Sequence, residues 1–142
     1  MATRETGQHY QDPKKALWCL KKLPLLADIP HDTLQQLADS VQLWDLRRRQ
    51  VIYLPGDPGQ AVYFLSVGRV KISKVTRDGK ELTLDYRVAG DPFGELCLIE
   101  GGAREDMAEA MDTSLVIEVE RGIFERLVQK EGLIGFRLVK VL

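Results

Sequence analysis

The 142-residue sequence contains only two histidines and two cysteines, and this scarcity excludes several classes of protein. Small secreted domains that depend on disulfides carry four or more cysteines, so Cys19 and Cys97 are expected to be buried free thiols. His9 and His31 both precede residue 32, whereas a cupin-type metal enzyme needs clustered histidines with a carboxylate. An iron–sulfur centre needs several grouped cysteines. We therefore expect no metal site.

Long apolar runs are also missing. No stretch approaches the roughly 20 residues of a membrane helix, and residues 1–15 lack the hydrophobic core of a signal peptide. The absence of a Gly-x-Ser-x-Gly motif, and of histidine from the strand-rich region, leaves no nucleophile with a base beside it. We expect a soluble, cytoplasmic protein that makes no membrane contact and is not an enzyme.

The chain has almost no excess of charge. Twenty Lys and Arg residues face 21 Asp and Glu residues, so the formal net charge is −1 and the pI is about 6.1. DNA-binding domains usually have a basic face and often a high pI. This polypeptide alone is therefore not expected to hold DNA.

Three parts follow one another along the chain. Residues 1–12 are polar, lack periodicity and are predicted to form a flexible arm. Residues 13–132 form the folded domain, which opens with Asp12-Pro13, a helix-capping acceptor followed by proline at the first helical position. In residues 133–142, apolar residues lie on neighbouring helical faces without a stop signal. We expect this segment to begin a truncated helix.

The centre of the chain has the two-residue period of β-strands. Short segments rich in β-branched and aromatic residues run from residue 42 to residue 119, and one of them, Val70 to Val75, slips once in register. Asp78-Gly79 supplies the positive φ angles of a tight hairpin turn. Short strands at regular spacing predict a sandwich or barrel of about eight strands. The fold is therefore mainly β, with short flanking α-helices.

One stretch carries the chemistry of a binding site. Gly94 stands where a backbone N–H can approach a phosphate closely, and Glu95 beside it can accept hydrogen bonds from ribose hydroxyls. Arg104 follows about ten residues later, and its planar guanidinium can make a two-pronged contact with a phosphate. Together they would cradle one phosphate and one sugar.

These residues, in this order, give the chain its resemblance to a known family. Pro55-Gly56-Asp57, the segment Tyr63 to Lys71, the segment Gly90 to Leu96, and Arg104 with Ala110 resemble the cyclic-nucleotide-binding domains of the catabolite-activator (CRP/FNR) transcription regulators. The resemblance covers roughly residues 23–142. It implies a double-stranded β-helix (jelly-roll) barrel that senses a small-molecule effector such as cyclic AMP or cyclic GMP.

The resemblance also implies a site and partners. Gly94 would lie at the phosphate and ribose, Glu95 would take the ribose hydroxyl, and Arg104 would pair with the cyclic phosphate. The implied ligand-binding set is Phe93, Gly94, Glu95, Leu96, Cys97, Arg104 and Glu105. In the family the exit helix pairs with its twin in a homodimer and leads to a helix-turn-helix DNA reader, which is absent from these 142 residues.

At one position the chain departs from the family pattern. A small hydroxyl residue commonly follows the arginine in cyclic-AMP-binding members, whereas Glu105 and Asp106 follow it here. Carboxylates beside a phosphate would repel it or pair with Arg104. A different small effector, a structural Glu95–Arg104 ion pair and a redox response at Cys97 therefore remain alternatives. So does a ligand-free or non-transcriptional regulatory module of the same fold.

Overall fold

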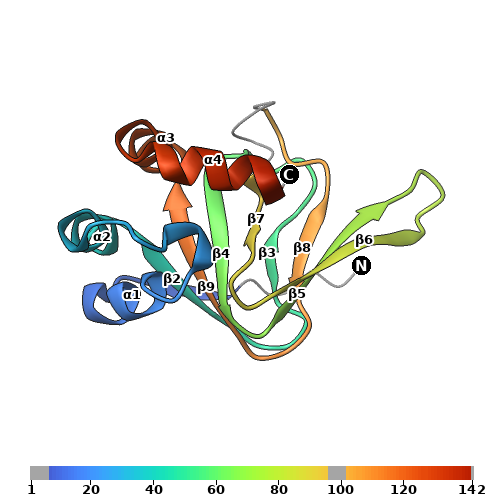
Figure 1. Cartoon of the computed structure of the whole chain (residues 1–142). Helices are drawn as coiled ribbons and strands as arrows, with labels where there is room; N and C mark the ends of the chain where they lie inside the picture. The colour runs from blue at the N-terminus through green and yellow to red at the C-terminus, as the bar shows by residue number, and fades with distance from the viewer. Residues whose placement is uncertain (1–6, 96–101, 142) are drawn as a thin grey trace.

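The computed structural model describes residues 7–95 and 102–141, which form nine β-strands, four α-helices and one short 3₁₀ helix (Figure 1). The helical elements are α1 (Pro13–Leu20), the 3₁₀ helix η1 (Pro24–Leu26), α2 (His31–Ala38), α3 (Arg121–Lys130) and α4 (Gly132–Val141). The strands are β1 (Gln8–Tyr10), β2 (Gln42–Leu46), β3 (Val51–Tyr53), β4 (Ala61–Val67), β5 (Arg69–Val75), β6 (Glu81–Val88), β7 (Pro92–Phe93), β8 (Met107–Ala110) and β9 (Ser114–Glu120).

The strands form two antiparallel sheets that face each other. One sheet has the order β1-β2-β9-β4-β7 and the other has the order β3-β8-β5-β6. The apolar side chains between them, among them Leu65, Ile72, Phe93 and Val116, form one buried cluster. This jelly-roll arrangement confirms the predicted mainly β fold, although the two sheets are not closed into a continuous barrel.

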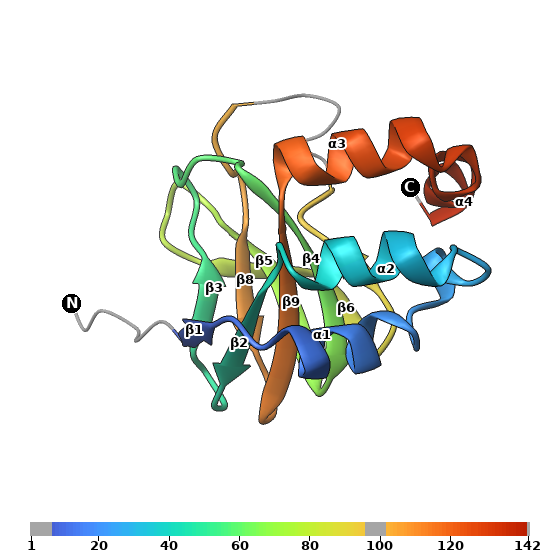
Figure 2. The same ribbon diagram turned by 90° about the vertical axis from the view of Figure 1, so that its left-hand side faces the viewer.

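The helices cover the outer face of the first sheet (Figures 1 and 2). Phe64 and Ile117 project from that face into a second apolar cluster, which the helices complete with residues such as Leu20 and Phe124. The ring centres of Phe64 on β4 and Phe124 on α3 lie 6.0 Å apart, so α3 packs directly on β4. Burial of a phenylalanine side chain contributes about 2 kcal/mol, and this cluster is what attaches the helices to the sheets.

The predicted flexible arm over residues 1–12 is wrong for its last part. Gln8–Tyr10 form β1, which pairs with Asp45, Trp44 and Leu43 of β2. The edge of the His9 ring also contacts the Trp44 ring, with the ring centres 4.9 Å apart. β1 is only three residues long and lies at the edge of its sheet. So short a strand has no detectable alternation of apolar and polar residues, and the sequence did not predict it. Residues 1–6 lie outside the described part of the chain.

α4 begins at Gly132, where the sequence predicts a helix. Part of its apolar face is buried against the rest of the domain, and part is exposed. Ile134 is fully buried in the cluster beneath the helices, and Leu138 packs against the same cluster. Leu133 and Phe136 are exposed. None of the helices in residues 7–95 and 102–141 is long and apolar enough to cross a membrane.

Candidate ligand-binding site

β7 brings the Gly94 segment against β4 at the end of the first sheet. Phe93 pairs with Tyr63, and their rings stack with the centres 5.3 Å apart. Gly94 follows with φ at +72°, a conformation that side chains rarely adopt. A Cβ atom on Gly94 would lie 2.9 Å from a terminal nitrogen of Arg104 and 3.1 Å from the Tyr63 ring. Glycine is therefore required here so that Arg104 can approach the chain closely.

Arg104 is held in place by the turn that precedes β4. Its backbone N–H donates to the carbonyl of Asp57, and its carbonyl accepts from the N–H of Gly56. A bridge between Pro58 and Ala103 extends this pairing. Pro55-Gly56-Asp57, which carried part of the family resemblance, thus positions the arginine.

The guanidinium of Arg104 lies inside the fold. Nη1 donates to the carbonyl of Gly94 at 2.7 Å, and Nη2 donates to the carbonyl of Ala61 at 2.5 Å. Its central carbon lies 4.3 Å from the centre of the Tyr53 ring and 5.6 Å from that of Tyr63, distances at which a cation and an aromatic face attract. The side chain is therefore fixed by two carbonyls and two rings.

The third nitrogen of this guanidinium, Nε, differs from Nη1 and Nη2. Within the described residues, the buried Nε of Arg104 has no hydrogen-bond partner. The residue as a whole is only 8% exposed. A buried unpaired donor costs about 1–3 kcal/mol, so an anionic acceptor that reached this nitrogen would recover that energy.

Glu95 is buried like Arg104. Its ion-pair partner is Arg87, and not Arg104 as one alternative in the sequence analysis predicted. The Oε1 atom of Glu95 lies 3.7 Å from Nη2 of Arg87, which comes from β6. Arg87 also lies 3.6 Å from the carboxylate of Asp85. We call Phe93, Gly94, Glu95 and Arg104, with the residues that contact them, the cassette. It contains a second arginine, Arg87 on β6, which is in a different sheet from β7 and which the sequence motif did not reveal.

The two acidic residues after Arg104 have different surroundings. Glu105 is exposed, whereas Asp106 is half-buried. Burial raises the pKa of the Asp106 carboxyl above its ordinary value of 3.8, and the Arg104 charge and the Tyr53 hydroxyl offset only part of that rise. Burial also raises the pKa values of Tyr53 and Tyr63, so both rings stay neutral beside Arg104. Of the two carboxylates that follow Arg104, Asp106 is therefore the one that interacts with Arg104 and Tyr53.

Substituting Asp106→Asn is expected to raise the melting temperature at pH 7. Asparagine keeps an acceptor for Tyr53 and removes the buried charge. The pKa of Asp106 is higher in the folded protein than in the unfolded chain, so protonation stabilises the fold, and this gain is lost as the pH rises from about 4 through the folded-state pKa. The melting temperature of the Asp106→Asn variant should therefore exceed that of the unsubstituted protein by an amount that grows from pH 4 to pH 7. Parallel curves would contradict this assignment.

The predicted set is only partly brought together. Phe93, Gly94, Glu95 and Arg104 lie in one region, and Glu105 lies at its exposed side. Leu96 and Cys97 fall outside the described residues, whereas Cys19 is a buried free thiol, as expected. Tyr53, Tyr63, Arg87 and Asp106 complete the site. Tyr53 and Arg87 lie on strands that flank the motifs and have no other sequence signal, whereas Tyr63 begins a segment that carries the resemblance and Asp106 follows Arg104 closely.

The fold is thus a jelly roll in which a glycine and a buried arginine meet. The model of the cyclic nucleotide-binding domain family matches residues 43–131, and the chain belongs to this family. The match includes every element of the cassette described above.

Individual relatives agree with this assignment. A CRP-like cAMP-activated global transcriptional regulator from Mycobacterium tuberculosis is 24% identical over 123 residues, which are 87% of this chain and 55% of that protein. A cAMP-dependent protein kinase regulatory subunit from Debaryomyces hansenii is 30% identical over 109 residues, or 77% of this chain and 23% of that protein. The chain thus spans about half the length of the CRP-like regulator.

A solved structure has the same fold. The sensor domain of the transcriptional regulator DNR from Pseudomonas aeruginosa superposes with a TM-score of 0.79 at 22% identity, covering 90% of this chain and 86% of that one. At this identity the likeness shows the fold alone.

Proposed function

We propose that the chain is the effector-sensing domain of a CRP/FNR-type bacterial transcription regulator and that its role is regulatory, not catalytic. The effector would be a small anion such as a cyclic nucleotide, held at Gly94, Glu95 and Arg104. The observation that carries this proposal is the buried Nε of Arg104, which is unpartnered within the described residues while Nη1 and Nη2 are both bonded. A phosphate oxygen is the acceptor that best suits a guanidinium.

Signalling would run through α4. An effector that orders the cassette favours one arrangement of the neighbouring elements, and a ligand can shift such an equilibrium only by its difference in affinity for the two states. We propose that α4 transmits this shift to a helix-turn-helix DNA reader outside residues 1–142, in a cytoplasmic homodimer. The CRP-like relative, named as a cAMP-activated transcriptional regulator, supports this role.

Calorimetric titration with cyclic AMP and cyclic GMP tests the ligand. We expect one of them to bind and to raise the melting temperature, because a ligand at 100 times its Kd adds about 2.7 kcal/mol to the free energy of unfolding. Arg104→Lys keeps the charge but loses the planar fork, and should weaken binding at least about tenfold. Arg126→Met, at an exposed position on α3, should bind like the unsubstituted protein.

Two outcomes would contradict the proposal in different ways. No heat and no thermal shift with either nucleotide would remove the cyclic-nucleotide assignment and favour another effector or a ligand-free module. Binding that Arg104→Lys leaves unchanged would place the ligand elsewhere on the protein.

A second candidate is a regulatory module attached to an output other than DNA binding. The kinase regulatory subunit among the relatives favours it, because its similarity extends over 77% of this chain. The two candidates share the cassette chemistry and differ in the output. Binding of the natural full-length protein to DNA fragments from its own genome, with and without effector, separates them.

A further inference from the structure

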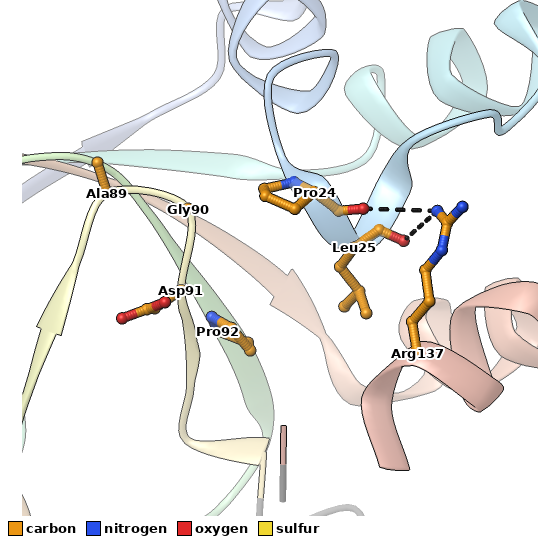
Figure 3. Close-up of a pocket in the computed structure, with 7 residues that line it drawn as sticks. All are labelled: Pro24, Leu25, Ala89, Gly90, Asp91, Pro92 and Arg137. Atoms are coloured by element: carbon orange, nitrogen blue, oxygen red, sulfur yellow. Dashed lines mark hydrogen bonds between the residues drawn. The ribbon is translucent and has the colours of Figure 1, made fainter. Parts of the chain in front are cut away.

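A cavity of about 330 Å³ lies outside the cassette, between η1, the turn from β6 to β7, and α4 (Figure 3). It is lined by Pro24, Leu25, Ala89, Gly90, Asp91, Pro92 and Arg137. Ligand pockets commonly begin at about 300 Å³, and an apolar cavity of about 150 Å³ already accepts benzene. The space therefore suits one ring with a short substituent.

The lining is mainly apolar and carries a single cation. Pro24 and Leu25 form the wall on η1, and Pro92 faces them from the start of β7 (Figure 3). The carboxylate of Asp91 accepts from the Val88 N–H at 2.9 Å and is turned away from Leu25 and Arg137. Arg137, on the α4 side, is therefore the charged group that a bound molecule would meet.

Arg137 is bound to its own fold mostly by weak contacts. Nη1 lies 3.4 Å from the carbonyl of Pro24 and 3.3 Å from that of Leu25, and it also contacts the carbonyl of Ala27. Nη2 lies 3.3 Å from the carboxylate of Asp28, whose side chain is 83% exposed, so water screens this pair. Apart from the Ala27 contact, these distances are long for hydrogen bonds.

We propose that this cavity is a second binding site, for a small aromatic or aliphatic carboxylate. The apolar body would lie between Pro24, Leu25 and Pro92. The carboxylate would make a two-pronged contact with Arg137, which is shorter and stronger than the long contacts to the carbonyls of Pro24 and Leu25. This proposal rests on residues outside the cassette and does not depend on the function proposed above.

Occupancy of the site would change how α4 is attached. Through Arg137 the helix is tied to η1, from which it is separated by more than 100 residues of sequence. A carboxylate that takes the guanidinium releases part of that tie. The same molecule fills the space between α4 and the turn that precedes β7.

Nuclear magnetic resonance titration of the ¹⁵N-labelled chain with benzoate tests the proposal. Benzyl alcohol carries the ring without the charge, and acetate carries the charge without the ring. We expect benzoate to shift the amides of Leu25, Ala89, Asp91 and Arg137, with benzyl alcohol at least about tenfold weaker and acetate without effect at the same concentrations. Shifts centred on Gly94 and Arg104, or none with benzoate, would overturn it.

Arg137→Met supplies the decisive comparison because methionine keeps an apolar stem and removes the charge. In this variant benzoate should lose its advantage over benzyl alcohol, whereas benzyl alcohol should bind as before. Arg137→Lys, which keeps a charge without the fork, should be intermediate, and Arg126→Met should behave as the unsubstituted chain. If benzoate still binds the Arg137→Met variant as strongly, the assignment of Arg137 is wrong.

Discussion

Replacing Arg104 by methionine is expected to lower the free energy of unfolding by about 3 kcal/mol. The substitution leaves the carbonyls of Gly94 and Ala61 without their donor, and a buried acceptor that loses its partner costs about 1–3 kcal/mol. It also removes the stacking of the cation on Tyr53 and Tyr63, worth about 1 kcal/mol. The methionine side chain makes some apolar contacts of its own, and the substitution removes the buried unpaired Nε. Both effects reduce the expected loss of stability. Urea denaturation measures the change.

Arg126→Met is the matched control. It removes the same charge from an exposed position on α3, where substitutions usually change stability by less than about 0.5 kcal/mol. An equal, small effect for both variants would mean that the Arg104 guanidinium does not join the Gly94 segment to β4. The expected difference would show that the side chain proposed to bind the ligand also stabilises the fold.

This double role limits what the sequence could predict about the site. The spacing of Gly94 and Arg104 correctly indicated that the two lie together. The bond from Arg104 to the carbonyl of Ala61 joins positions 43 residues apart and uses a backbone atom, so no side-chain pattern encodes it. The pairing of Glu95 with Arg87 depends on which face of β6 turns inward. Such contacts follow from the packing of the two sheets.

Local signals were more reliable than inferences about packing. Asp12 caps α1 by accepting from the N–H of Lys15, as Asp12-Pro13 predicted. The break in the alternation of β5 coincides with a shift in its pairing with β6 between Ile72 and Ser73. The alternation of Leu82 and Leu84 correctly predicted the strand β6. It also suggested that these side chains are buried, whereas they are 54% and 50% exposed. β6 is the edge strand of a hairpin that projects from the body (Figure 1), so alternation there has no facing sheet to pack against.

Gly68→Ala is expected to be among the most damaging single substitutions outside the site, with a loss of about 3 kcal/mol or more. Gly68 joins β4 to β5 with φ at +104°, and a Cβ atom there would lie 2.2 Å from the Oγ and 2.8 Å from the Cα of Ser114. The left-handed conformation alone costs about 1–2 kcal/mol for a residue with a side chain. The overlap with a backbone atom of β9 adds about 1–3 kcal/mol, because neither strand can move without disturbing the sheet.

Gly79→Ala separates the two costs. Gly79 has φ at +82° in the turn before β6, and no heavy atom lies within 4 Å of its added Cβ, so only the conformational cost of about 1 kcal/mol is expected. The difference between the variants in urea denaturation measures the contact with Ser114. Combining Gly68→Ala with Ser114→Gly should restore part of the loss, since the Oγ and Cβ overlaps disappear while the Cα overlap remains. Equal losses for both alanine variants would contradict the close contact. Gly68 lies in the Tyr63–Lys71 segment that supported the family resemblance, so part of that resemblance encodes a tight strand connection and not the ligand.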